Sequence, residues 1–98
     1  RPDGFLMSHA VDGYSLALDF PVIRGRREKL WSMVRALAEP VVAAGGRFYP
    51  AKDAALPRDL YRSTFREGQL GRFAGIKAKL DPDRLLRSGL ADRLIYED

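Results

Sequence analysis

A pair of glycines, Gly45-Gly46, separates a long helical pattern from a short aromatic segment and constrains the fold more than any other feature. Before the pair, apolar residues recur at the spacing of one helix face over roughly residues 26–44. They include Leu30, Val34, Leu37 and Val41. Gly45 can adopt the left-handed conformation that ends helices, and Gly46 leads into residues 47–49, which we expect to form a short strand. Pro40 lies inside the helical pattern and removes one backbone hydrogen bond, so we expect a kink or an early end there.

A second strand is predicted upstream, where apolar and polar residues alternate strictly from Tyr14 to Phe20. This period of two is typical of a half-buried strand, and Pro21 closes it because proline cannot donate to a ladder. Two short strands cannot bury both faces of a sheet alone. We therefore expect the sheet to continue in a missing N-terminal part or in another copy of the chain, and its exposed edge to favour self-association.

Further helices are expected in the second half. Pro57 suits a first helical position, and Gly68 should end that helix. Another helix is predicted over residues 69–79, where Asp81-Pro82 should stop it and cap a turn through Leu85-Leu86.

Ser88 or Gly89 should open a last short helix over residues 90–96, and residues 1–12 are expected to be a loop or a truncated strand. The predicted fold class is therefore α+β, with antiparallel strands packed against three to four helices.

Composition limits the chain to one small domain, because it has only 98 residues. It contains no cysteine, which excludes disulfides but leaves the compartment open between the cytoplasm and the membrane or cell envelope. No apolar run is long enough to cross a bilayer. Position 1 is arginine rather than methionine, so we expect an excised or trimmed fragment. The net charge of +4 is spread along the chain, and no nucleic-acid partner is expected.

Few residues are candidates for chemistry. His9 is the sole histidine, and without cysteine it cannot build a zinc or nucleophile site, so no metal site is predicted. Lys52 and Asp53 lie in a loop after the predicted strand, with Tyr49 just before them. Loop lysines are mostly solvated, and residue type alone gives Lys52 about one chance in ten of a functional role. An Asp81-Pro82-Asp83 cation loop is less plausible than a helix-capping turn.

Three blocks in order resemble the C-terminal end of flavin-linked oxidoreductases of the vanillyl-alcohol-oxidase superfamily. They are the segments 13–21, 45–53 and 76–82, followed by a stretch at 88–94 similar to the terminal helix of that family. The likeness is greatest to the decaprenylphosphoryl-ribose oxidase group and related sugar and lactone oxidases. It covers about residues 13–94. Ala54-Ala55 departs from the family pattern, which often has a serine and a basic residue there.

This resemblance implies that residues 13–98 are the C-terminal part of a substrate (cap) domain and that the FAD-binding domain is absent from the chain. It implies oxidation of a sugar or polyol hydroxyl by hydride transfer to FAD, as in bacterial cell-wall arabinan precursor synthesis, with a lipid-linked sugar among the candidate substrates. Lys52 matches the catalytic lysine that lines the flavin–substrate cleft, Tyr49 lies beside it, and Asp53 would orient it. The fragment alone should be inactive and should pack against its own FAD-binding domain.

Other interpretations stay open from the residues. An aldonolactone or alditol oxidase is the nearest enzymatic alternative. A small basic interaction domain, binding an acidic partner or nucleic acid through arginines such as Arg24, Arg26 and Arg27, is an alternative of another class. A structural dimer module is the third.

Overall fold

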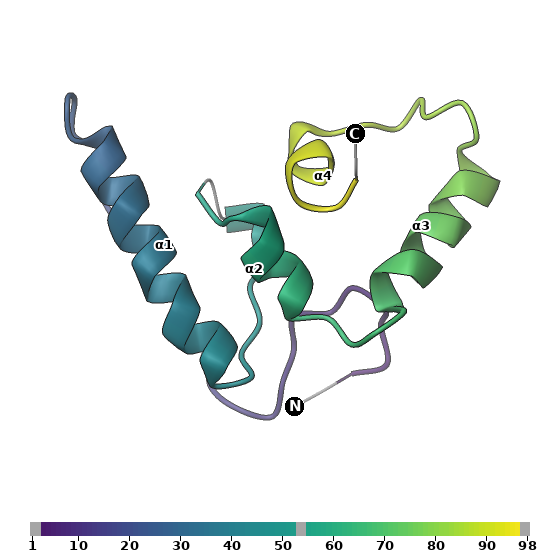
Figure 1. Ribbon diagram of the computed structural model, residues 1–98, viewed down its shortest axis with the longest axis horizontal. Coiled ribbons are helices and arrows are strands. Elements are labelled where there is room, and N and C mark those ends of the chain that lie inside the picture. The colour runs from purple at the N-terminus through teal and green to yellow at the C-terminus, as the bar shows by residue number, and fades with distance from the viewer. Residues whose placement is uncertain (1–2, 53–54, 97–98) are drawn as a thin grey trace.

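The computed structural model describes residues 3–52 and 55–96. Within these ranges, all of the regular secondary structure is helical (Figure 1). In chain order they are α1 (Arg27–Ala43), the 3-10 turn η1 (Pro50–Lys52), α2 (Arg58–Ser63), α3 (Gln69–Leu80) and α4 (Gly89–Leu94). The molecule is flattened, with principal extents of 42 × 32 × 18 Å. In Figure 1, α2 lies between α1 and α4, and α3 stands apart on the far side of α4.

The predicted α+β class is wrong, because none of the described residues forms a β-strand. None of the described residues pairs its backbone with the alternating segment from Tyr14 to Phe20, and Tyr14 and Leu16 are 104% and 80% exposed. Residues 47–49 are not a strand either. Arg47 is held by the carbonyl of Ser8, and Phe48 packs against the core. Alternation alone does not make a sheet, because a strand needs a partner for its backbone hydrogen bonds.

The first helix was predicted to within one residue at each end, but Pro40 does not end it. Its C-terminus is a Schellman motif. Gly45 has a φ of 74°, as predicted for a left-handed residue. Its N–H donates to the carbonyl of Val42 at 2.9 Å, and the N–H of Gly46 donates to the carbonyl of Val41 at 2.8 Å. The glycine pair therefore satisfies two carbonyls that the helix end would leave unpaired.

The core lies where α2 packs against both α1 and α4. Its buried side chains are Ala38, Leu56, Tyr61 and Leu94. The ring of Tyr61 meets that of Phe65 edge-on at 5.1 Å, and burial raises the pKa of the Tyr61 phenol. No residue of α3 is buried, so this helix adds little to the core.

The second helix is shorter than expected. It begins after Pro57, which is its N-cap rather than its first residue, and it ends at Ser63. The hydroxyls of Ser63 and Thr64 donate to the carbonyls of Leu60 and Tyr61 at 2.8 and 2.7 Å. These carbonyls are therefore satisfied by side chains, so the helix need not continue to supply them with backbone donors. Gly68 does not end α2 but is the N-cap of α3, with a φ of 76°.

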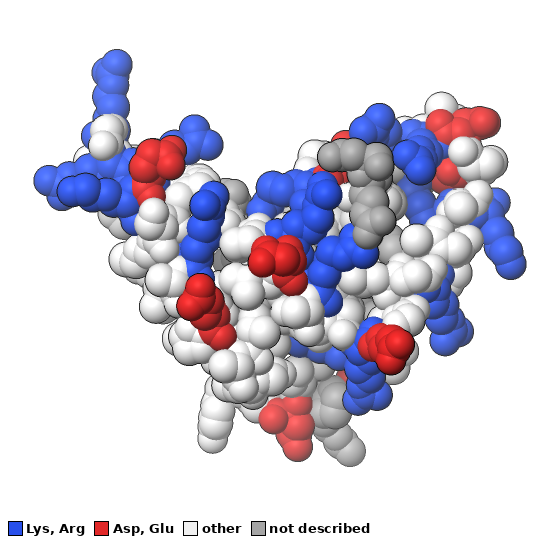
Figure 2. All heavy atoms as spheres, in the orientation of Figure 1, with Lys and Arg blue, Asp and Glu red and all other residues white. Residues whose placement is uncertain are grey.

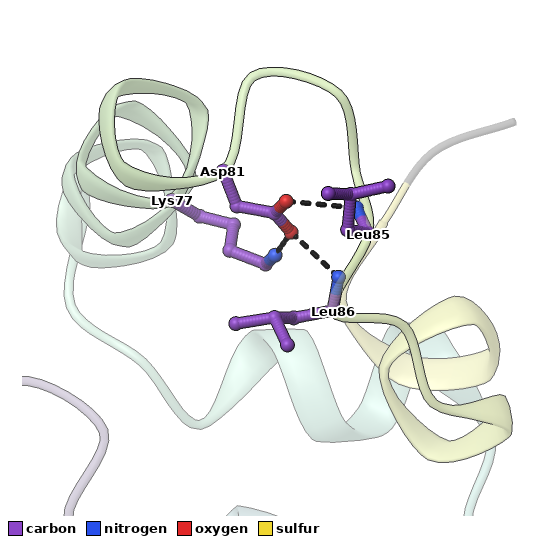
Figure 3. Close-up of polar contacts among 4 residues, drawn as sticks. All are labelled: Lys77, Asp81, Leu85 and Leu86. Carbon is purple, nitrogen blue, oxygen red and sulfur yellow. Dashed lines mark hydrogen bonds and ion pairs between the residues drawn. The ribbon is translucent and has the colours of Figure 1, made fainter.

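Asp81 closes α3 and holds the loop that follows (Figure 3). Its carboxylate accepts the N–H groups of Leu85 and Leu86 at 2.7 and 3.0 Å and pairs with the ammonium of Lys77, one turn earlier in α3. The interpretation of Asp81 as a residue that ends α3 and caps a turn is therefore confirmed, and residues 82–88 form no helix.

The last helix begins at a cap that the sequence predicted. The hydroxyl of Ser88 accepts the N–H of Ala91 at 3.2 Å. This helix ends at Leu94, two residues before the expected end.

Replacing Asp81 with alanine should lower the free energy of unfolding by about 1–3 kcal/mol, because the buried carboxylate satisfies two backbone donors and one ammonium. Urea denaturation followed by circular dichroism measures the change. Asp83→Ala is the matched control, since Asp83 is exposed and its loss should cost less than about 0.5 kcal/mol. Equal effects of the two substitutions would show that Asp81 does not hold the 82–88 turn.

Candidate functional site

The loop after α1 carries the candidate site, and Arg47 fixes its path. The guanidinium Nη1 of Arg47 donates to the carbonyl of Ser8 at 2.7 Å. The same guanidinium lies 5.7 Å from the centre of the Phe65 ring, over its face. The loop is therefore held between the N-terminal segment and the residues that follow α2.

The N-terminal segment is ordered by Asp3. Its carboxylate accepts the N–H of Phe5 at 3.0 Å and the hydroxyl of Ser8 at 2.8 Å. The hydrogen bond from the Phe5 N–H, followed by that from Ser8, holds the pKa of the Asp3 carboxyl below its usual value, because both favour the ionised form. Gln69, at the start of α3, donates to the carbonyl of Leu6 at 2.8 Å. This turn thus presents the Ser8 carbonyl to Arg47.

Tyr49 lies on the surface, beside His9. Its side chain is 53% exposed, and the two ring centres are 4.9 Å apart at an interplanar angle of 48°. His9 is exposed, as expected from its loop position, but it has an aromatic partner that the sequence did not indicate. The structure therefore brings Tyr49 together with His9, from a segment 40 residues earlier in the chain.

Lys52 is the last residue of η1. Its side chain lies outside the described part of the structure, and so does all of Asp53, so the roles predicted for these two residues stay predictions. Within the described ranges, no group of three or more histidine or acidic side chains is arranged to hold a metal ion.

A groove lies beside the segment that follows Lys52 and Asp53 in the chain. Its volume is about 510 Å³. It is lined by Trp31, Arg35, Ala55, Leu56, Pro57, Arg58 and Arg93. Aromatic, apolar and cationic groups therefore meet there, between α1, the start of α2 and the end of α4.

Three arginines join α2 and the residues before it to α4 through hydrogen bonds to backbone carbonyls. Two of them, Arg58 and Arg93, also line the groove. Arg58 donates to the carbonyls of Arg93 and Asp92 at 2.8 and 2.7 Å, and Arg93 donates to the carbonyl of Leu56 at 2.7 Å. Arg62 donates to the carbonyl of Ile95 at 3.0 Å. These contacts could not be predicted from the sequence, because they join residues 33 to 37 positions apart and their acceptors are backbone carbonyls that any residue supplies.

A second groove, of about 240 Å³, is mainly apolar and lies where residues 21–23 meet the start of α1. It is lined by Pro21, Ile23, Arg26, Lys29, Leu30 and Met33. The apolar surface continues along α1 through Leu37 and Val41, which are exposed.

The chain is distantly related to an oxidase. Over 88 residues, which are 90% of this chain, it is 28% identical to decaprenylphosphoryl-beta-D-ribose oxidase of Mycolicibacterium smegmatis. The chain spans only 18% of the length of that relative. No family model matches the chain, and no solved structure matches it. The resemblance to that oxidase group is thus supported, and the placement in the vanillyl-alcohol-oxidase superfamily stays a prediction.

Among the described residues, none of the helices combines the length and the apolar composition needed to cross a bilayer.

Proposed function

We propose that this chain is the C-terminal, substrate-side part of an FAD-linked oxidase that oxidises a hydroxyl of a sugar or polyol. The observation that carries the proposal is the 28% identity over 90% of the chain to an oxidase whose name states a sugar substrate. When bound, FAD would accept a hydride from the carbinol carbon, while the hydroxyl proton leaves to a base, so that a carbonyl forms.

The glycine pair does not supply a phosphate-binding site for FAD. Both grooves are open to solvent, and Gly45-Gly46 ends a helix rather than starting one, so the pair does not form a phosphate-binding turn at a helix N-terminus. The proposal assigns FAD to a separate domain, because the chain spans only 18% of the length of its relative. It leaves to this chain the side of the cleft that faces the substrate.

Lys52 is proposed as the catalytic residue, with Tyr49 and Asp53 lining the same cleft. Hydride transfer would place negative charge on the reduced flavin, and an ammonium group held nearby would stabilise that charge electrostatically. Two features support this position. The loop is anchored on both sides, by the Schellman end of α1 and by Arg47, and Tyr49 is accessible beside it.

The exposed apolar surface of α1 supports the proposal of a larger enzyme. Large side chains along one face of this helix and the segment before it are exposed, including Ile23, Met33, Leu37 and Val41. A contiguous patch of this kind on a soluble domain marks an interaction site. We assign it to the contact with the FAD-binding domain.

A chimera tests the proposal. The matched segment of the M. smegmatis oxidase would be replaced by the corresponding residues of this chain, and the product purified. We expect the chimera to retain the flavin absorption band and to oxidise the substrate of the parent oxidase. Lys52→Ala should then lower kcat by about 100-fold or more with the flavin retained, because the charge developing in the transition state loses its counter-ion.

Lys79→Ala is the matched control, since Lys79 is exposed on α3 and lines neither groove, and it should leave kcat unchanged. The 98-residue chain purified by itself should carry no flavin absorbance. Tight FAD binding by the chain alone would contradict the assignment of FAD to another domain. A flavin-loaded chimera that keeps its full rate after Lys52→Ala would exclude Lys52 as the catalytic residue.

A further inference from the structure

The alternating segment from Tyr14 to Phe20 exposes both its backbone and its apolar side chains. All seven of its residues are exposed. None of their backbone N–H and C=O groups is hydrogen-bonded to another described residue. Large apolar side chains occupy every second position of the segment. A second backbone would satisfy the free donors and acceptors and cover part of the apolar surface, so the segment is suited to pairing with another chain.

The apolar side chains are complementary to themselves in one antiparallel register. A two-fold axis at Ala17 places Tyr14 opposite Phe20 of a second copy, and Leu16 opposite Leu18. Aromatic side chains then meet aromatic ones and leucine meets leucine, all on one face of the ribbon, and such cross-strand pairs stabilise a sheet. A shift of one residue would place apolar side chains opposite polar ones, which disfavours the other registers.

The polar face and the ends of the segment fit the same register. Asp19 is the charged residue of the segment and lies opposite Ser15, whose hydroxyl can donate to the carboxylate. A parallel pairing in register would place the two copies of Asp19 side by side, and like charges directly opposite each other are destabilising. Pro21 falls opposite Gly13 and ends the pairing, because proline has no backbone donor.

Charge also favours this segment over other surfaces as the place where two copies meet. The chain has a net charge of +4. Figure 2 shows Lys and Arg side chains gathered over the outer end of α1 and over α2 and α4, so copies that approach through these surfaces repel each other. Residues 10–23 contain no lysine or arginine. The segment therefore fits a second copy better than an anionic partner.

We propose that two copies of this chain pair through Tyr14–Phe20 as an antiparallel two-stranded ribbon. Each backbone supplies the hydrogen bonds that the other lacks, and each copy contributes four large apolar side chains to one face. A two-stranded ribbon is only marginally stable, so the dimer dissociates on dilution. The pairing uses residues outside the α1 surface assigned to the FAD-binding domain, and it does not depend on the oxidase proposal.

Sedimentation equilibrium of the 98-residue chain tests the pairing, at concentrations up to about 1 mM, the Kd of a weak association. We expect a reversible equilibrium between monomer and dimer. Amide hydrogen exchange followed by NMR should show protection of every second N–H within residues 14–20 as the dimer forms, because only alternate N–H groups of a strand point toward one neighbour. A chain that is monomeric at every concentration, or a dimer without this protection, overturns the proposal.

An exchange of charges tests the register. Leu16→Lys combined with Leu18→Lys places like charges opposite each other across the ribbon, so it should weaken self-association at least about tenfold. Leu16→Glu combined with Leu18→Glu should weaken it for the same reason. An equimolar mixture of the two double variants should form a heterodimer, because each ammonium group then lies opposite a carboxylate. A mixture that does not associate overturns the proposed register.

Leu85→Lys combined with Leu86→Lys is the matched control. It adds the same charge at two leucines that are 81% and 76% exposed and lie outside the segment, so this variant should dimerise nearly as the wild type does. Equal weakening in the control and in the variant with lysine at positions 16 and 18 would show repulsion by net charge, and the proposed pairing would then be wrong.

Discussion

Leu94→Ala is expected to lower the free energy of unfolding by about 2–5 kcal/mol, the range for truncating a buried leucine to alanine. Leu94 is the one large side chain in the described part of the chain that is 0% exposed. It packs with Ala38, Leu56 and Tyr61, so its loss leaves a cavity where all three core helices meet. A domain of this size has a total stability of only about 5–15 kcal/mol, so the variant should be partly unfolded at room temperature or close to it.

Urea denaturation followed by circular dichroism measures this effect, and the single Trp31 gives a second probe on α1. Leu85→Ala removes the same atoms from a side chain that is 81% exposed, and it should change stability by less than about 0.5 kcal/mol. If Leu94→Ala unfolds at the same urea concentration as Leu85→Ala, α4 does not pack on α2 as described.

Gly46→Ala is expected to destabilise the protein by about 1–3 kcal/mol, the usual cost of forcing an extra carbon into filled space. A Cβ atom at this position would lie 2.7 Å from Cγ1 of Val41 and 2.9 Å from the carbonyl oxygen of the same residue. That oxygen already accepts the Gly46 N–H. The chain can relieve the clash only by opening the hydrogen bond that ends α1. Thermal unfolding followed by circular dichroism measures the loss.

Two comparisons isolate the close approach as the cause. Gly71→Ala, in α3, meets nothing within 4 Å and should stabilise the helix by about 0.5–1 kcal/mol, since alanine is the better helix former. In a Val41→Ala background, Gly46→Ala should cost less, because the side-chain contact is gone while the contact with the carbonyl remains. A neutral Gly46→Ala in the wild-type background would contradict the described path of residues 45–49.

The sequence predicted local structure well wherever a local interaction determines it. The bounds of α1 and α3 were correct to one residue at each end, and Gly45, Asp81 and Ser88 end or cap helices as expected. Each of these features depends on contacts within about five residues. The same reasoning failed at α2, where Gly68 was assigned to the end of one helix and instead begins the next.

Candidate site residues were predicted only in part. The resemblance led to Tyr49, Lys52 and Asp53, and of these only the side chain of Tyr49 is described. The pairing of Tyr49 with His9 and the arginine contacts of α4 could not be predicted. They join distant segments through a ring face or a backbone carbonyl, and neither leaves a periodic pattern in the sequence.

The amino-acid sequence by itself determined where helices form and end, because apolar spacing, glycine backbone freedom and side-chain caps act over a few neighbouring residues. It also showed the distant relation to decaprenylphosphoryl-beta-D-ribose oxidase. Only the tertiary structure decided that the alternating segment 14–20 stays unpaired and that α2, rather than a sheet, organises the core. The physical reason is that a strand exists only where a second backbone supplies its hydrogen bonds, whereas a helix satisfies its own.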